Sequence, residues 1–384
     1  MFALLLILPT IAFVPIYFFI FPAIYIVAKK SIEGDFSYLP NNFNKININL
    51  LIIVAIIIAS SINKWVHWSD KLTILEFLPY TVAILLAYFL AKNLKDKDLK
   101  IIVWLIVIEG LVVVTQYFMG INTFIPSLDH FNENIVKNPD LMYNRRPLGL
   151  SLNSSVIAYK LLLAYLILDY LKLRNILHNI FRFILLLGIF FTFNRTIFLV
   201  FFVYIGFSMI KIYSPIINNL LVKKIRKNQI KYFVLAIVGI VFLSLIVIFS
   251  YEDIYAQLTR GRSDGVDFSG RDNIWKGFTE FISENIFFGN GSEKYYLPRG
   301  DKLAHAHNSF LQVWATHGVF ILGLYLLLVF RNITRKNLIF VILILVYSCF
   351  QYGIFWGTSL IDIILFKILF FDSSTSKKKS ETST

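Results

Sequence analysis

The sequence contains a single cysteine, Cys349, and only 16% of its 384 residues are charged. A lone cysteine excludes an internal disulfide framework and a cysteine metal cage. Charge this sparse, together with 57% hydrophobic residues, excludes an ordinary soluble domain, which could not bury so much apolar surface. No small-residue cleavage site follows the first apolar run, so we expect this run to be a retained span rather than a signal peptide.

Long apolar runs dominate the chain instead, for example Ala3 to Val27, Ile101 to Met119 and Phe233 to Phe249. Each is long enough to cross a hydrocarbon layer about 30 Å thick as a helix. The pattern predicts an all-α, polytopic transmembrane bundle of about 11–12 spans over residues 1–372. The expected spans lie near residues 2–27, 47–61, 72–90, 101–120, 154–171, 181–194, 196–213, 232–250, 318–330, 338–352 and 358–371. The prolines Pro9, Pro15 and Pro22 leave open whether the first run is one span or a re-entrant pair.

Acidic residues number 23 against 37 basic ones, which gives a net charge of +14. The basic residues gather in alternate loops, at 29–45, 92–100, 172–182, 223–231, 331–336 and 377–379. The positive-inside rule makes these loops cytoplasmic, so the excess charge indicates topology and anionic lipid rather than nucleic acid. The loops at 121–153 and 251–317 then face away from the cytoplasm, and residues 373–384 are expected to form a disordered cytoplasmic tail.

The longer outer loop holds a polar and aromatic island, Gly270 to Gly318, in an otherwise apolar chain. Apolar residues recur at helical spacing in its first part, namely Ile274, Trp275, Phe278, Phe281, Ile282 and Ile286. This spacing predicts an amphipathic helix in the membrane interface, with Trp275 and the Phe rings toward the acyl chains; a plain lid over the spans is the alternative. Gly289 and Gly291 predict a turn, and Asn308 or Ser309 is expected to begin the next helix.

The order of motifs in this loop resembles the O-antigen ligase and polymerase superfamily. An Arg271…Trp275 helix precedes an Asn285…Gly289-Asn-Gly turn, and His307-Asn308 is followed by nine residues and a glycine. Two upstream segments also match the superfamily, namely Arg146-Pro-Leu-Gly149 with Asn153 and Ala158, and Phe193-Asn194-Arg195-Thr196. The chain departs from the common pattern at Ile286, where proline is usual, at Ile321, and around Arg195, where Ser-Arg-Gly is usual.

This resemblance implies transfer of a glycan from a polyprenyl diphosphate to a hydroxyl acceptor. Arginine suits the diphosphate, because its fork pairs with phosphate oxygens and stays charged, and a neutral histidine suits removal of the acceptor proton. His307, Arg195 and Arg271 are therefore the expected catalytic residues. The expected substrate-binding residues are Arg146, Arg145, Asn153, Trp275, His305 and Asn308. We expect no metal or other cofactor, because no third ligand accompanies the His305-Ala-His307 pair.

The resemblance favours a GT-C-like, inverting glycosyltransferase in the bacterial inner membrane, with an undecaprenyl-diphosphate-linked donor. Polymerisation of O-antigen or capsule repeat units is the preferred activity, and ligation of polymer to lipid A-core is the close alternative. A lipid-linked oligosaccharide flippase or transporter and a structural scaffold are more distant ones. A chain-length regulator and a flippase are the possible protein partners. Glu76, Glu109 and Lys160 lie within expected spans, where pairing or snorkelling is favoured over a transport path.

Overall fold

The computed structural model describes residues 1–34, 47–69, 80–125, 146–221, 271–299, 302–355 and 357–371. These residues are mainly helical, which confirms the all-α expectation. The exception is a short antiparallel hairpin in the outer loop, β1 (Leu297–Arg299) with β2 (Lys302–Ala304), which pairs Leu297 with Ala304. The expected span at 232–250, the first part of the one at 72–90 and the expected tail lie outside the described residues.

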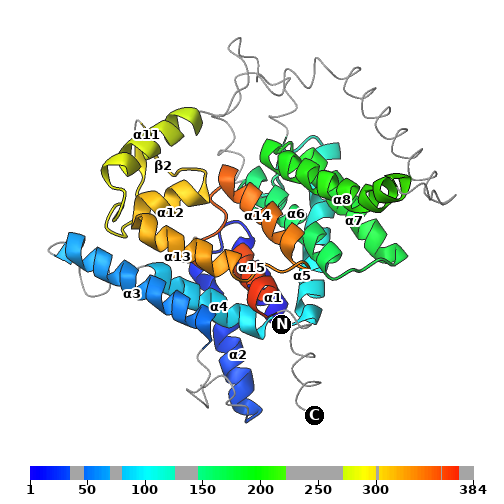
Figure 1. Cartoon of the computed structure of the whole chain (residues 1–384). Helices are drawn as coiled ribbons and strands as arrows, with labels where there is room; N and C mark the ends of the chain where they lie inside the picture. The colour runs from blue at the N-terminus through cyan, green and yellow to red at the C-terminus, as the bar shows by residue number, and fades with distance from the viewer. Residues whose placement is uncertain are drawn as a thin grey trace.

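The helices follow the expected spans with shifted boundaries (Figure 1). They are α1 (Phe2–Ile7), α2 (Ile20–Ile32), α3 (Ile48–Trp68), α4 (Ala83–Asn93), α5 (Asp96–Phe118), α6 (Ser154–Tyr170), α7 (Ile176–Phe191), α8 (Arg195–Leu221), α11 (Arg271–Glu284), α12 (Ser309–His317), α13 (Val319–Phe330), α14 (Leu338–Phe350) and α15 (Leu360–Phe370). The short 3-10 helices are η1 (Leu8–Thr10), η2 (Ile16–Phe19) and η5 (Tyr80–Val82).

The first apolar run is not one helix. It breaks after α1 at η1 and resumes as a regular helix only at α2. Pro9 and Pro15 flank the break, and Phe13 between them adopts a left-handed backbone with φ +66°. Proline removes a backbone donor and disfavours helix in the residue before it, which accounts for the interruption.

Asparagine side chains begin several of the helices. Asn47 accepts a hydrogen bond from Asn49 N at the start of α3, and Asn175 accepts one from His178 N at the start of α7. At the start of α5, the Asp98 carboxylate accepts a hydrogen bond from Lys95 N at 3.0 Å. Such caps satisfy amide groups that would otherwise lack partners at a helix N-terminus.

The core of the bundle forms around α5, which packs against α1, α6 and α7. Close approach depends on two glycines, because a Cβ on Gly188 of α7 would lie 2.9 Å from the Leu161 side chain and one on Gly110 of α5 would lie 3.2 Å from it. Elsewhere α13 packs on α3, α15 on α4 and α14 on α8. Figure 1 shows α11 and the hairpin beside α12, at the edge of the bundle.

Among the described helices, α3 with 21 residues and α5 with 23 are long and apolar enough to cross a membrane. An outward apolar stripe runs along α5, made of Ile101, Trp104, Ile108 and Leu111. Contiguous apolar surface of this kind is unfavourable in water and normal against lipid. The stripe therefore agrees with a helix that faces acyl chains.

Labelling of single cysteines will test the topology. Thr279 is exposed on α11, so Thr279→Cys in a Cys349→Ala background should react with an impermeant thiol reagent in intact spheroplasts. Lys97→Cys, exposed at the start of α5 in a basic loop, should react only after the membrane is opened. Ser292→Cys is a matched control that should stay unreactive in folded protein, because Ser292 is buried. If Lys97→Cys reacted in intact spheroplasts and Thr279→Cys reacted only after the membrane was opened, the chain would have the opposite orientation in the membrane.

Candidate functional site

The outer-loop helix α11 packs onto protein and has its own small core. Ile274, Phe278 and Ile282 form a buried row that contacts Ala306 and Ala315. The ring of Tyr295 stacks on that of Phe281, with 3.8 Å between the ring centroids. The expectation that this helix turns Trp275 and its Phe rings toward acyl chains was therefore wrong. Its apolar face covers α12 and the hairpin, and the Trp275 indole donates a hydrogen bond to Ala306 O at 2.7 Å.

The glycine turn packs on the C-terminal end of α12. Asn290 N donates to Ala315 O at 2.8 Å, and Ser292 N donates to Thr316 O at 2.9 Å. Gly289 has φ +57°, and a Cβ there would lie 2.7 Å from two carbonyl oxygens of α12. Gly318 has φ +82°, and a side chain there would collide with the Phe287 carbonyl. The spacing between the turn and the glycine after α12 therefore reflects two backbones in direct contact.

One end of α3 holds the same turn, which the sequence analysis did not foresee. The Asn63 amide donates to Phe288 O and to Ser292 Oγ, each at 2.9 Å. The Trp68 indole donates to Asn290 O at 3.0 Å, and Lys64 pairs with Glu293 at 2.6 Å. The only sign of this contact in the sequence is the run of polar residues at the end of the apolar helix α3. Contacts between α3 and a turn more than two hundred residues later arise only from tertiary packing.

His317 completes this network in the neutral state. Its Nδ1 lies 3.0 Å from Ser292 Oγ and 3.3 Å from Ser60 Oγ. Burial lowers the pKa of His317 to about 3. The imidazole therefore stays uncharged above that pH and holds α3, the turn and α12 together.

The two other histidines of this loop, His305 and His307, lie side by side, with 4.0 Å between ring centroids. His307 N donates to His305 Nδ1 at 3.1 Å, which places the proton of a neutral His305 on Nε2. Ala306 between them is held on both sides, because its N–H donates to Gln312 Oε1 at 2.8 Å and its carbonyl accepts from Trp275. His307 has φ +49°, and its buried Nδ1 has no hydrogen-bond partner among the described residues.

Burial and neighbouring charge keep both histidines neutral. Burial, then His305, then Arg271 lower the pKa of His307 to about 4, and a hydrogen bond with Gln351 opposes this. Burial and Arg271 lower the pKa of His305 in the same way. Above pH 5 the His307 imidazole is therefore an available base. Because an anion bound beside it would favour the protonated form, its pKa would rise in a complex with a phosphate group.

Arginines begin two helices that meet at this point. Arg195 is the first residue of α8 and Arg271 the first of α11. The Arg271 Nη1 donates to Thr196 Oγ1 at 3.4 Å, which joins the two helix starts. A cation is disfavoured at a helix N-terminus, where the macrodipole is positive. Two such positions side by side form a strongly electropositive spot that suits an anion.

The start of α6 joins the same group of helix N-termini. Asn194 caps α8 through Ile197 N at 3.1 Å, and its amide donates to Ser155 Oγ at 3.0 Å. Asn153 in turn caps α6 by accepting from Ser155 N and Val156 N. The structure thus links α6, α8 and α11 at the ends where Arg195, Arg271 and the histidines lie.

A family model described as O-antigen ligase matches residues 180–326. This range includes Arg195, α11, the glycine turn, His307 and the glycine after α12. This match supports the O-antigen ligase/polymerase superfamily for this part of the chain. Neither the curated proteins nor the solved structures contain a match to this chain.

The match supports a membrane enzyme of the ligase/polymerase type, which agrees with the apolar helices α3 and α5. The superfamily match confirms the resemblance drawn from the Arg271…Trp275, Gly289-Asn-Gly and His307-Asn308 motifs. The upstream Arg146…Asn153 segment precedes the matched range.

The structure brings three of the expected site residues together, namely Arg271, His305 and His307, and Arg195 precedes Thr196, which Arg271 contacts. Three others have structural contacts. Asn153 caps α6, Asn308 caps α12 through Phe310 N and Leu311 N, and Trp275 is bonded to Ala306. Arg146 precedes α6, and Arg145 lies outside the described residues. Within the described ranges, no group of three or more His, Cys, Asp or Glu side chains could hold a metal ion.

The Trp275 hydrogen bond should matter for activity. Trp275→Phe removes a bond worth about 1 kcal/mol that fixes the carbonyl between the two histidines, so we expect a loss of about 5-fold in turnover. Trp314→Phe is the matched control, because that indole donates to Ile286 O, which already accepts from Val319 N. Turnover at equal protein level is the measurement. Equal effects of both substitutions would show that the Trp275 bond does not position the histidines.

Proposed function

We propose that this superfamily member is a polytopic, GT-C-like glycosyltransferase that polymerises lipid-linked repeat units in the bacterial inner membrane. Its donor is a glycan on undecaprenyl diphosphate, and its acceptor is a sugar hydroxyl of another repeat. The observation that carries this proposal is the pair of arginines at adjoining helix N-termini beside a neutral histidine pair. The alternation of basic loops supports a site on the outer side of the membrane.

Arg195 and Arg271 would bind the diphosphate. A guanidinium fork can pair with two phosphate oxygens at once, and the helix N-termini add backbone donors and a favourable dipole. The two arginines neutralise the charge that grows on the leaving diphosphate, so the reaction as proposed calls for no metal ion.

The transfer would proceed by single displacement. The acceptor oxygen bonds to the anomeric carbon as the bond from that carbon to the diphosphate oxygen breaks, and the bonding electrons leave with the diphosphate. A ring nitrogen of His307 takes the acceptor proton. Attack opposite the leaving group inverts the anomeric centre. Protonated His307 next to the released diphosphate is then stabilised by the opposite charge.

Ligation of finished polymer to lipid A-core is a second candidate, because the matched family model is described as O-antigen ligase. Both activities use the same donor chemistry and differ in the acceptor. The lipopolysaccharide of a deletion strain separates them. Core plus one repeat indicates a polymerase, and bare core with accumulated lipid-linked polymer indicates a ligase. Loss of every outer-leaflet lipid-linked intermediate would instead indicate a flippase and would contradict both.

Replacement of either arginine should impair donor use. A charge-assisted hydrogen bond to phosphate contributes about 1.5–3 kcal/mol, so Arg195→Ala and Arg271→Ala should each lower kcat/KM for the donor by about 10-fold to 150-fold. Lysine should restore only part of the activity, since it keeps the charge and loses the fork. Kinetics with purified lipid-linked donor provide the measurement. Near-normal kcat/KM in both alanine variants would remove the arginines from the site.

His307→Ala should fold, insert and bind donor, yet lose about 100-fold to 10,000-fold in turnover, which is the usual contribution of a positioned base. His305→Ala should be milder. In wild-type enzyme, kcat/KM should stay flat from pH 8 down to about 5 and fall as His307 protonates near pH 4. A fall centred near pH 6.5 would contradict the neutral, buried histidine. Full activity of both alanine variants would exclude a histidine base.

A further inference from the structure

The proposed mechanism leaves a buried ion pair unexplained. Lys160 Nζ on α6 lies 2.6 Å from Glu109 Oε2 on α5, and the two side chains are 1% and 5% exposed. Two charges inside an apolar helix bundle are costly, even when paired. Their other contacts show what the pair holds.

Glu109 holds the segment that leads into α6. Its Oε1 accepts from Leu150 N at 3.1 Å and from Ser151 Oγ at 3.0 Å. About two turns further along α5, Gln116 exchanges two hydrogen bonds with the backbone of Gly149, at 3.0 and 2.9 Å. Gly149 has φ +59°, and a Cβ there would lie 3.2 Å from Glu109 Oε1. One face of α5 therefore makes hydrogen bonds to three consecutive residues of this segment, Gly149, Leu150 and Ser151.

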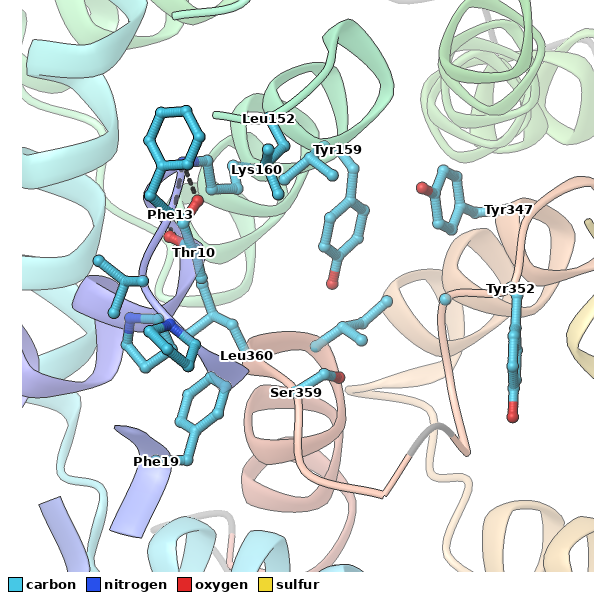
Figure 2. A pocket seen from close by; sticks show the side chains of 16 residues that line it. Thr10, Phe13, Phe19, Leu152, Tyr159, Lys160, Tyr347, Tyr352, Ser359 and Leu360 are labelled. Carbon is cyan, nitrogen blue, oxygen red and sulfur yellow. Dashed lines mark hydrogen bonds between the residues drawn. The ribbon is translucent and has the colours of Figure 1, made fainter. Parts of the chain in front are cut away.

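Lys160 holds the broken first run. Its Nζ donates to Thr10 O at 3.3 Å and lies 3.4 Å from Thr10 Oγ1, as the dashed lines in Figure 2 show. Ala12 N then donates to Leu150 O at 2.8 Å, which ties the broken run to the segment before α6. Irregular backbone at membrane depth must find its partners within the protein. The ion pair provides them for both segments at once.

Lys160 also lines a partly open pocket. A cavity of about 570 Å³ lies between the broken run, α6, α14 and the segment before α15, with Lys160 in its wall (Figure 2). Apolar side chains of Pro, Phe, Val, Leu and Ile share the wall with the hydroxyl groups of Thr10, Tyr159, Tyr347, Tyr352 and Ser359. Tyr352 reaches the His305 ring with 6.2 Å between centroids. A holding function is therefore supported by the direct hydrogen bonds of Glu109 and Lys160 to the two irregular segments.

We propose that Glu109, with Lys160 as its counter-ion, is a positioning residue that fixes the segment from Arg146 to Asn153, and with it Arg146 and the N-terminus of α6, against the donor site. The inference rests on the proposed function, in which a diphosphate lies at the helix starts around Arg195. Removal of the acceptor atom that holds Leu150 should let Arg146 move, whereas removal of the charges alone should not.

Two uncharged double variants separate these effects. Glu109→Gln with Lys160→Met keeps an oxygen that can accept from Leu150 N and Ser151 Oγ. Glu109→Leu with Lys160→Met removes it. Both should fold, because replacement of a buried ion pair by neutral groups of similar volume is often neutral or stabilising. Thermal unfolding and gel filtration of the full chain in lipid nanodiscs check this.

The first readout is the dissociation constant for undecaprenyl diphosphate. We expect the Gln/Met variant to stay within about 3-fold of wild type and the Leu/Met variant to bind about 10-fold more weakly, the effect of one lost hydrogen bond. Arg146→Ala should weaken wild type similarly and add nothing to Leu/Met. Equal loss in both double variants would mean that the charges or the contact of Lys160 with Thr10, and not the Glu109 oxygen, are required, and would overturn the proposal. If Arg146→Ala weakened binding further in the Leu/Met variant, the loss in Leu/Met would not act through Arg146, and this result would also overturn the proposal.

The second readout does not depend on the donor. Leu152 is an exposed residue within the held segment, so a nitroxide on Leu152→Cys in a Cys349→Ala background reports the mobility of this segment. The label should become more mobile in the Leu/Met variant only. An immobile label in Leu/Met would refute the holding of this segment. If the label became mobile in the Leu/Met variant but wild type bound no undecaprenyl diphosphate, Glu109 would hold the segment as proposed and the proposed function would be overturned.

Discussion

The concentration of positive charge where α8 and α11 begin is the constraint on which the rest of the site depends. Arg195 and Arg271 lie at positions that the helix dipoles make unfavourable, and Thr196 joins the two helix starts. Such an arrangement is stable only if the surrounding bundle holds it rigidly. A bound anion, such as the proposed diphosphate donor, would remove this electrostatic penalty.

The histidine pair follows from the same electrostatics. A cation nearby and a buried environment both disfavour imidazolium, so His305 and His307 remain neutral. The backbone between them is held by Trp275 and Gln312 from two different helices. Rigid placement and a lowered pKa therefore have one origin, which is the packing of α11 and α12 around a short loop beside Arg271.

Support for this loop comes from parts of the chain that carry no motif. Asn63, Trp68 and Lys64 of α3 hold the glycine turn, and Glu109 with Lys160 holds the broken first run to the entry of α6. In both places a polar side chain within or at the end of an apolar helix bonds to irregular backbone. Such backbone cannot find partners in lipid, so the helices must provide them.

The sequence by itself determined the helical class and the apolar stretches that became α3, α5 and α6, because these depend on local composition. Motif order predicted Arg195, Arg271 and His307 as site residues, and this stays a prediction. The sequence also indicated the break in the first run through Pro9 and Pro15. Only the tertiary structure decided which face of α11 is buried and that Glu109 pairs with Lys160. Helical periodicity identifies an apolar face but not its partner, since lipid and protein attract that face alike.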